Sequence, residues 1–227
     1  MLREWDKLPK NMQTEAVRPY YESLKKKKVS LALKRAFDVI ASTILIIILS
    51  PLLIIISVLI VTDSKGGVFY RQERVTQYGK KFRIFKFRTM VANADKIGTQ
   101  VTVSNDNRIT RIGSAIRKYR IDEIPQLFNI LVGDMSLVGT RPESVHYVKH
   151  YTPEMMATLL MPAGVTSEAS ILYKDEAELL DKADDVDRVY IEKVLPDKMK
   201  YNLASIKNFS VIKDIKTMIK TVIAVVR

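Results

Sequence analysis

The chain has no cysteine, two histidines and one tryptophan among its 227 residues. Without cysteine it can form neither a disulfide framework nor a thiolate metal site, and a reducing compartment is the simpler assumption. His146 and His150 are four residues apart, but no glutamate stands between them as a helical zinc motif requires. A Walker phosphate loop and a Gly-x-Gly-x-x-Gly segment are also missing, which argues against the nucleotide-binding folds that use them.

Positive charge is in excess. Lys and Arg number 37 against 25 Asp and Glu, which gives a formal net charge of +12. This balance favours anionic partners such as nucleic acid, anionic lipid or nucleotide phosphates, and a solvated basic surface explains it equally well. Nucleic acid fits least, because aromatic residues do not interleave with the cations as in a reader motif. The length suits one well-buried domain.

An apolar run from Val39 to Val61 contains 23 residues and no charge, enough for a helix to span a bilayer core. The run begins too far from the N-terminus, and is too long, for the apolar part of a signal peptide. Ser50 and Pro51 stand at its middle, where proline removes a backbone donor and bends a helix. A carbonyl freed near Pro51 needs a new partner, and Ser50 can provide one.

Basic residues flank both ends of this run. They are Lys25, Lys26, Lys27, Lys28, Lys34 and Arg35 before it, and Lys65, Arg71, Arg74, Lys80 and Lys81 after it. A kinked span and a re-entrant helix both accommodate the proline, but a single span should carry its positive charge on one side. The two-sided charge therefore favours a helix-break-helix hairpin with both flanks in the cytoplasm. Asp38, just inside the boundary, fits a cap, a pair with Arg35, or solvation.

The pattern predicts a helix-rich α+β fold in three parts. Polar, basic residues 1–33 are expected to form a preamble on the surface, residues 34–63 the re-entrant membrane helix, and residues 64–227 a cytoplasmic domain. Strands are expected at 68–70 and 81–90, joined through Gly79, and short helices at 112–120 and 124–131. The remainder has helical tendency, with turns at Pro142, 162–164 and Pro196. An amphipathic helix at 211–226 suits either the core or a lipid interface.

Two acidic residues stand out in the sequence Asp122-Glu123-Ile124-Pro125. Because proline fits the first turn of a helix, both carboxylates should lie at a helix start. Helix-end electrostatics explain them without further function. The alternative is a phosphate site. It would be formed by the upstream cations, Arg117 among them, and by backbone donors of residues 133–143. Lys86 and Arg88, two apart on a predicted strand, either grip a diphosphate or form an exposed basic face.

Several of these segments together resemble the bacterial sugar transferase family, also described as monotopic phosphoglycosyl transferases. The resemblance covers most of the chain. Its carriers are Lys34-Arg35-Ala36-Phe37-Asp38 before the run with central Ser50-Pro51, Phe85-Lys86-Phe87-Arg88-Thr89-Met90, the block from Ile121-Asp122-Glu123-Ile124-Pro125-Gln126 to Gly133-Asp134-Met135-Ser136, and Gly139-Thr140-Arg141-Pro142-Glu143.

The resemblance implies a monotopic enzyme that moves a sugar 1-phosphate from a UDP-sugar to polyprenol (undecaprenyl) phosphate and releases UMP. Asp122 would be the nucleophile that forms a phosphosugar-aspartyl intermediate, and Glu123 its partner carboxylate. Mg²⁺ would bridge Asp122 and the diphosphate. Lys86, Arg88, Arg117 and Arg141 match the basic residues of the family's motifs, which we assign to phosphate binding.

The resemblance also implies a location at the bacterial inner membrane, with residues 64–227 as a catalytic domain on its cytoplasmic face and membrane lipids as further partners. The reaction would initiate glycoconjugate or polysaccharide assembly. The segment 162–170 departs from the common Pro-Gly-Ile-Thr-Gly-x-x-Gln form, and Lys174 and Asn202 stand where many members carry Arg and Asp. The sequence resembles the family's minimal form, which is expected to lack the large N-terminal multi-span region of some relatives. The main alternative is a non-enzymatic, basic membrane-anchored scaffold.

Overall fold

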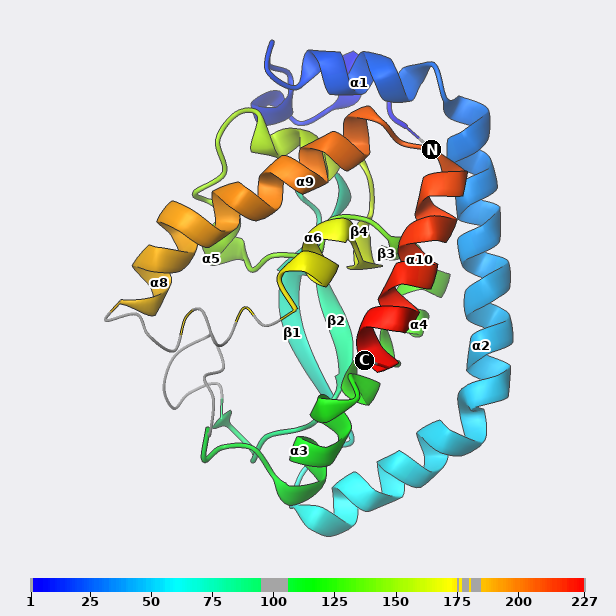
Figure 1. Ribbon diagram of the computed structural model, residues 1–227, viewed down its shortest axis with the longest axis vertical. Coiled ribbons are helices and arrows are strands. Elements are labelled where there is room, and N and C mark those ends of the chain that lie inside the picture. Colours follow the sequence, from blue (N-terminus) through cyan, green and yellow to red (C-terminus); the bar gives the residue numbers. More distant parts are fainter. Residues whose placement is uncertain (1, 95–105, 175, 177–179, 181–184, 227) are drawn as a thin grey trace.

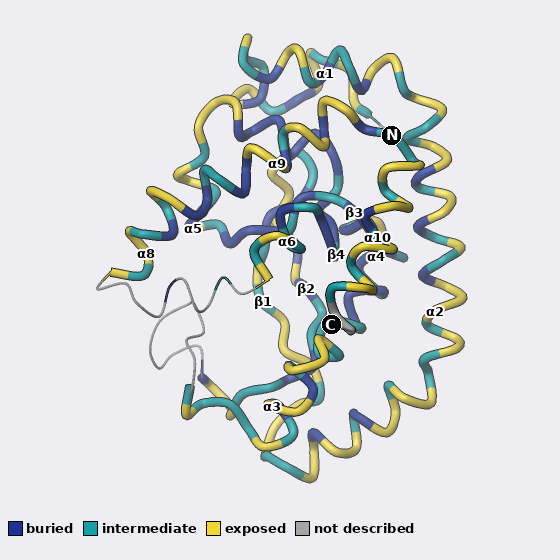
Figure 2. Tube along the Cα trace, in the orientation of Figure 1, coloured by how far each residue is buried: buried dark blue, intermediate teal, exposed yellow. Residues whose placement is uncertain are grey.

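The computed structural model describes residues 2–94, 106–174, 176, 180 and 185–226 of the chain. These residues form a helix-rich α+β structure, as predicted. A long helix, α2 (Lys28–Asp63), runs along one side of the molecule, and the remaining elements pack on its inner side (Figure 1). Exposed residues occur along the whole length of α2, where they alternate with partly buried and buried ones (Figure 2).

Helix α2 is continuous over 36 residues with Pro51 inside it, and it bends within its apolar stretch (Figure 1). Pro51 deprives the carbonyl of Ile47 of its helical donor, and the hydroxyl of Ser50 donates to this carbonyl at 2.8 Å. The role predicted for Ser50 is therefore confirmed. The predicted break is not: the helix bends without interruption. By length and composition α2 is long and apolar enough to cross a membrane.

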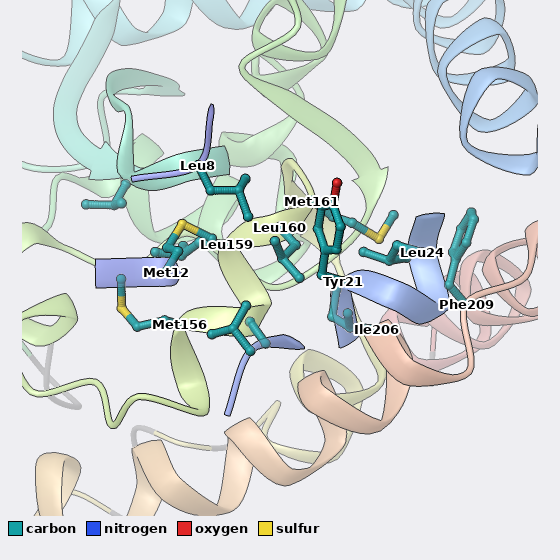
Figure 3. Packing of buried hydrophobic residues seen from close by; sticks show 13 residues of the cluster. Leu8, Met12, Tyr21, Leu24, Met156, Leu159, Leu160, Met161, Ile206 and Phe209 are labelled. Carbon is teal, nitrogen blue, oxygen red and sulfur yellow. The ribbon is translucent and has the colours of Figure 1, made fainter. Parts of the chain in front are cut away.

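The first residues of the chain pack into the largest hydrophobic cluster. They form two short 3₁₀ turns, η1 (Trp5–Lys7) and η2 (Lys10–Met12), and helix α1 (Arg18–Lys25). Met12, Tyr21 and Leu24 are buried there against η6 (Met155–Leu160) and α9 (Leu195–Lys207) (Figure 3). Polar composition predicted a surface preamble, but the few apolar side chains in this segment are spaced so that most of them face the core.

Two small sheets lie inside the bend of α2. Strands β1 (Phe69–Val75) and β2 (Lys81–Phe87) pair antiparallel through the turn η3 (Gln77–Gly79). The sequence predicted two strands joined through Gly79, but β1 is longer than the predicted 68–70 and β2 is shorter than the predicted 81–90. Strands β3 (Met135–Val138) and β4 (Ala163–Thr166) pair parallel and were not predicted. Gly139 and Gly164 let these two chains approach, because a Cβ on Gly164 would stand 2.1 Å from the Gly139 backbone nitrogen.

Helices complete the domain around these sheets. They are α3 (Arg111–Lys118), the 3₁₀ turn η5 (Ile121–Glu123), α4 (Gln126–Val132), α5 (Val145–Val148), α6 (Glu168–Leu172), α8 (Val186–Val189), the π-helical turn η7 (Tyr190–Val194), α9 and α10 (Val211–Val226). The helix predicted at 124–131 is present as α4 with slightly different bounds, and the C-terminal helix predicted at 211–226 is confirmed as α10. A turn at Pro196 was wrong, because helical backbone continues from α8 through η7 into α9 and Pro196 lies in the first turn of α9.

Candidate active site

Asp122 and Glu123 occupy the turn η5, directly before α4. Pro125 is the N-cap residue of α4, so the carboxylates lie at a helix start as the sequence indicated. The turn is entered through Arg120, whose φ of 53° lies in the left-handed region. This reversal after α3 directs the two carboxylates towards β2 and the segment that follows β3.

Glu123 is held by two cations. Lys86 on β2 donates to its Oε1 at 2.9 Å, and Arg141 donates to both of its carboxylate oxygens. The Glu123 side chain is 12% exposed. Burial alone would raise the pKa of Glu123, but the charges of Arg141 and Lys86 outweigh it and lower this pKa well below its ordinary value. Glu123 is therefore ionised and fixed at neutral pH.

Asp122 has different surroundings. Among the described residues, no hydrogen bond or ion pair holds its carboxylate. Burial raises the pKa of Asp122 above its ordinary value of 3.8, the charge of Lys86 opposes this rise, and Glu123 adds to it. Asp122 thus presents unpartnered carboxylate oxygens beside cations, which is the state a nucleophile or a metal ligand needs.

A cavity of about 720 Å³ opens beside these residues. Asp122, Lys86, Arg117 and Arg141 all line it, so the structure brings together five of the predicted site residues when Glu123 is included. Leu45 and Leu49 of α2 line the same cavity on another side. The cavity therefore joins a cationic wall to the apolar helix, and Ser50 and Pro51 follow in the same helix.

Arg88 makes different contacts from the other cations. It is 8% exposed, and its guanidinium donates to the carbonyls of Ile60, Ser64 and Lys65 at the end of α2. Strand β2 ends at Phe87, so the alternation that would place Arg88 beside Lys86 does not continue. Arg88 thus holds the end of α2 and does not line the 720 Å³ cavity, but it lines a neighbouring cavity of about 490 Å³ together with Asp122, Lys86 and Arg117.

Other residues at the site went unassigned in the sequence. Arg74 on β1 lines two smaller cavities that also include Lys86 and Arg117, and burial lowers its pKa. It was visible in the sequence as one of the cations after the apolar run, but no local pattern separated it from its neighbours. Lys174 lines the 720 Å³ cavity, whereas Asn202 is buried and lines a different one, between α9 and α10.

Oxygen ligands for a metal ion are few at this site. In the described ranges, no group of three or more His, Cys, Asp and Glu residues could hold a metal together. Mg²⁺, however, is commonly bound by one or two carboxylates with substrate phosphates and water completing its shell. The unpartnered carboxylate of Asp122 fits this requirement, whereas Glu123 is already saturated by Lys86 and Arg141.

The fold and the site define a domain in which one carboxylate held by cations and one unpartnered carboxylate lie near a long apolar helix. The family model for bacterial sugar transferases matches residues 29–227, and the chain belongs to this family.

Curated relatives agree with this assignment. The chain is 38% identical over 193 residues to a UDP-N-acetylgalactosamine-undecaprenyl-phosphate N-acetylgalactosaminephosphotransferase of Aeromonas hydrophila, covering 84% of this chain and 43% of the relative. It is 34% identical to a UDP-glucose:undecaprenyl-phosphate glucose-1-phosphate transferase of Klebsiella pneumoniae, over 86% of this chain and 40% of the relative. The chain thus spans about two fifths of these relatives. It also matches the exopolysaccharide production protein PSS of Rhizobium leguminosarum bv. phaseoli, at 33% identity over 96% of that protein.

Proposed function

We propose that this protein is a phosphoglycosyl transferase that moves a sugar 1-phosphate from a UDP-sugar to polyprenol (undecaprenyl) phosphate and releases UMP. The observation that carries the proposal is the unpartnered carboxylate of Asp122 in a cavity that has both a cationic wall and apolar residues of α2. A charged donor and a lipid-linked acceptor need these two surfaces at one place. The names of the relatives support the same donor and acceptor classes.

In this reaction an oxygen of Asp122 attacks the phosphorus that bears the sugar. The bond from this phosphorus to the bridging oxygen breaks, UMP leaves, and a phosphosugar-aspartyl intermediate remains. A phosphate oxygen of the polyprenol phosphate then attacks the same phosphorus and restores the Asp122 carboxylate. Splitting one displacement into two is the usual advantage of a covalent nucleophile.

The surrounding cations neutralise charge that would otherwise repel the nucleophile. Lys86, Arg117 and Arg141 lie on the cavity wall and would contact the diphosphate. Glu123 fixes Lys86 and Arg141 in place. Asp122 would also hold Mg²⁺ together with the diphosphate, and this ion would supply further charge neutralisation at the transferred phosphoryl group.

The arrangement of α2 supports a re-entrant location in the bacterial inner membrane, with the catalytic domain on the cytoplasmic face. Its first turns attach to β3 and α4, and its last turn attaches to α3 and Arg88. Both ends thus join one folded domain. The product, a lipid-linked sugar, would initiate assembly of a glycoconjugate or polysaccharide.

Purified protein in detergent, given a UDP-sugar and polyprenol phosphate, should release UMP. Asp122→Asn should lower this release by at least about a thousandfold, because the amide is not a nucleophile. With the donor alone, wild-type protein should acquire a phosphosugar adduct at residue 122, detectable by mass spectrometry of the intact chain.

The matched control is Asp197→Asn, which changes a half-exposed aspartate paired with Lys200 on α9. This variant should turn over like wild type. Unchanged turnover in Asp122→Asn would refute the covalent mechanism. The absence of UMP release with every UDP-sugar tested would instead favour a non-enzymatic scaffold.

A further inference from the structure

A second cavity, of about 320 Å³, lies beside the same cations. It shares Lys86, Arg117 and Arg141 with the cavity that contains Asp122. Among the described residues that line it, none belongs to α2 or α10. The second cavity therefore extends from the cations into the body of the domain, away from the apolar helix.

The wall of this cavity is polar and mostly fixed. The hydroxyl of Tyr190 donates to Glu143 at 2.6 Å, and Lys198 donates to the Tyr190 oxygen at 3.1 Å. Tyr147 and Tyr173 add aromatic surface. Because Tyr190, Glu143 and Lys198 satisfy one another, these groups hold their positions without a ligand.

Gln126 is the exception on this wall. It is the first residue of α4 and is 1% exposed, yet its side chain makes no hydrogen bond to any described residue. Its Nε2 is fully buried and has no partner. A buried amide without a partner costs free energy, so its presence calls for an explanation. Since Gln126 lines the cavity, a small shift of its amide towards a bound molecule would supply the missing partner.

We propose that this cavity binds the sugar ring of the donor, and that the Gln126 amide forms a hydrogen bond with a substituent of that ring. The inference rests on the proposed function. In a UDP-sugar, the sugar is joined through one oxygen to the phosphorus that Asp122 would attack, whereas the nucleoside is one phosphate further away. A cavity that begins at the cations beside Asp122 is thus placed for the sugar.

The chemistry of the Gln126 amide agrees with this occupant. A sugar ring is uncharged and carries hydroxyl or amide groups that both donate and accept hydrogen bonds, as a glutamine amide does. The volume of 320 Å³ lies at the lower end for ligand pockets, which suits one ring better than a whole nucleotide sugar. A site that hydrogen-bonds one substituent discriminates against sugars that lack it, so Gln126 would determine specificity.

The experiment compares binding of UDP and of UDP-sugars, together with UMP release, in the full chain in detergent. The donors are UDP-glucose, UDP-galactose and their N-acetylated counterparts. For the best donor, Gln126→Leu should weaken binding and lower kcat/KM about tenfold. The differences in kcat/KM among the four UDP-sugars should become smaller. Binding of UDP, which lacks the sugar, should stay within about twofold of wild type.

Stability separates this role from a structural one. Gln126→Leu removes an amide that has no partner, so the melting temperature should stay the same or rise. Gln77→Leu is the matched control: the Gln77 amide donates to the Leu160 carbonyl at 2.9 Å and lies outside the cavity. This variant should melt at a lower temperature and keep the wild-type sugar preference. Gln126→Glu, which keeps the shape but loses the amide donor, should repeat the effect on binding.

The outcomes are distinguishable. If wild type releases UMP and Gln126→Leu leaves binding and sugar preference unchanged, the sugar site is wrong while the proposed function stands. If Gln126→Leu weakens UDP and UDP-sugar equally, the cavity holds the nucleoside and the proposal is overturned. A clear fall in the melting temperature of Gln126→Leu would show a partner within the protein and would also overturn it. Failure of wild type to release UMP from any donor would overturn both proposals.

Discussion

Asp122 and Glu123 are neighbours in the chain with opposite electrostatic surroundings. Glu123 is bound by Lys86 and Arg141, which hold its pKa well below the ordinary value. Asp122 has no such partner among the described residues, and burial raises its pKa. Two carboxylates whose pKa values are pushed apart commonly have different roles in a reaction. We interpret Glu123 as the residue that positions the cations and Asp122 as the one that reacts.

The pH dependence of turnover should report the ionisation of Asp122. The nucleophile must be a carboxylate, so kcat/KM should fall as the pH drops through its raised pKa. Lys86 favours the carboxylate form and opposes the rise. Lys86→Met should therefore raise the pKa of Asp122 further and move the acid limb of the pH profile to higher pH. UMP release measured across the pH range in the same detergent gives the position of this limb.

The control for this shift is Lys81→Met on the same strand. Lys81 is exposed and pairs with Glu73 at 3.1 Å, away from the site. The acid limb of the pH profile of Lys81→Met should coincide with that of wild type. If the acid limb of the Lys86→Met profile stays in place or moves to lower pH, the assignment of Asp122 as the ionising nucleophile is contradicted. A lower maximal rate alone would not contradict it, since Lys86 is also expected to bind phosphate.

At the scale of elements, the attachment of α2 decides where the site lies. Asp38 is 3% exposed and accepts a hydrogen bond from the Leu137 backbone N–H at 3.0 Å. Arg35 donates to the carbonyls of Ile130 and Leu131 at the end of α4. The sequence left a cap, a pair with Arg35 and solvation open for Asp38. The structure shows a buried hydrogen bond to the backbone of β3 and, among the described residues, no hydrogen bond or ion pair between Asp38 and Arg35. These contacts fix α2 to the elements that border the cavity.

Asp38→Ala should lower stability, because the buried N–H of Leu137 loses its partner. The expected cost is about 1–3 kcal/mol, and each kcal/mol corresponds to roughly 2–4 °C in melting temperature for a chain of this size. Thermal unfolding in detergent measures the change. Thr43→Val is the control, because the exposed Thr43 hydroxyl donates to the Val39 carbonyl within the same helix. If Asp38→Ala and Thr43→Val melt at the same temperature, the hydrogen bond between Asp38 and the Leu137 N–H does not stabilise the fold as expected.

Elements with a strong local pattern could be predicted from the sequence. The β1–β2 hairpin follows from β-rich segments around Gly79, and α10 from a helical apolar stripe. Strands β3 and β4 have four residues each and pair across a long stretch of sequence, so no local period marks them.

The same limit applies to the site. The pairing of Lys86 with Glu123 and the separate place of Arg88 depend on where β2 ends, which residue spacing does not fix. The cation cluster could be predicted as a set of residues because several motifs carry it. The unpartnered state of Gln126 depends on packing from distant segments and has no sequence signal.

For the whole molecule, the decisive relation is that both ends of α2 join the same domain. Asp38 attaches the N-terminal part of α2 to β3. At the C-terminal end of α2, Asp63 accepts a hydrogen bond from the Ile112 N–H of α3. A straight helix of 36 residues would be about 54 Å long, well beyond a bilayer core of about 30 Å. A helix that crossed would place its two ends on opposite sides, which would pull one set of these attachments apart.

Because the chain has no cysteine, single cysteines can test this topology directly. Lys26→Cys and Gly67→Cys introduce thiols before and after α2, both at exposed positions, and a Cβ on Gly67 has nothing within 4 Å. A membrane-impermeant maleimide should label neither in intact spheroplasts and both in inverted vesicles, since both ends would face the cytoplasm. Ile48→Cys, exposed on the apolar part of α2, should resist the reagent in both preparations because lipid covers it. Labelling of Lys26→Cys and Gly67→Cys from opposite sides would establish a crossing helix, and the attachments at Asp38 and Asp63 could then not both exist in the membrane.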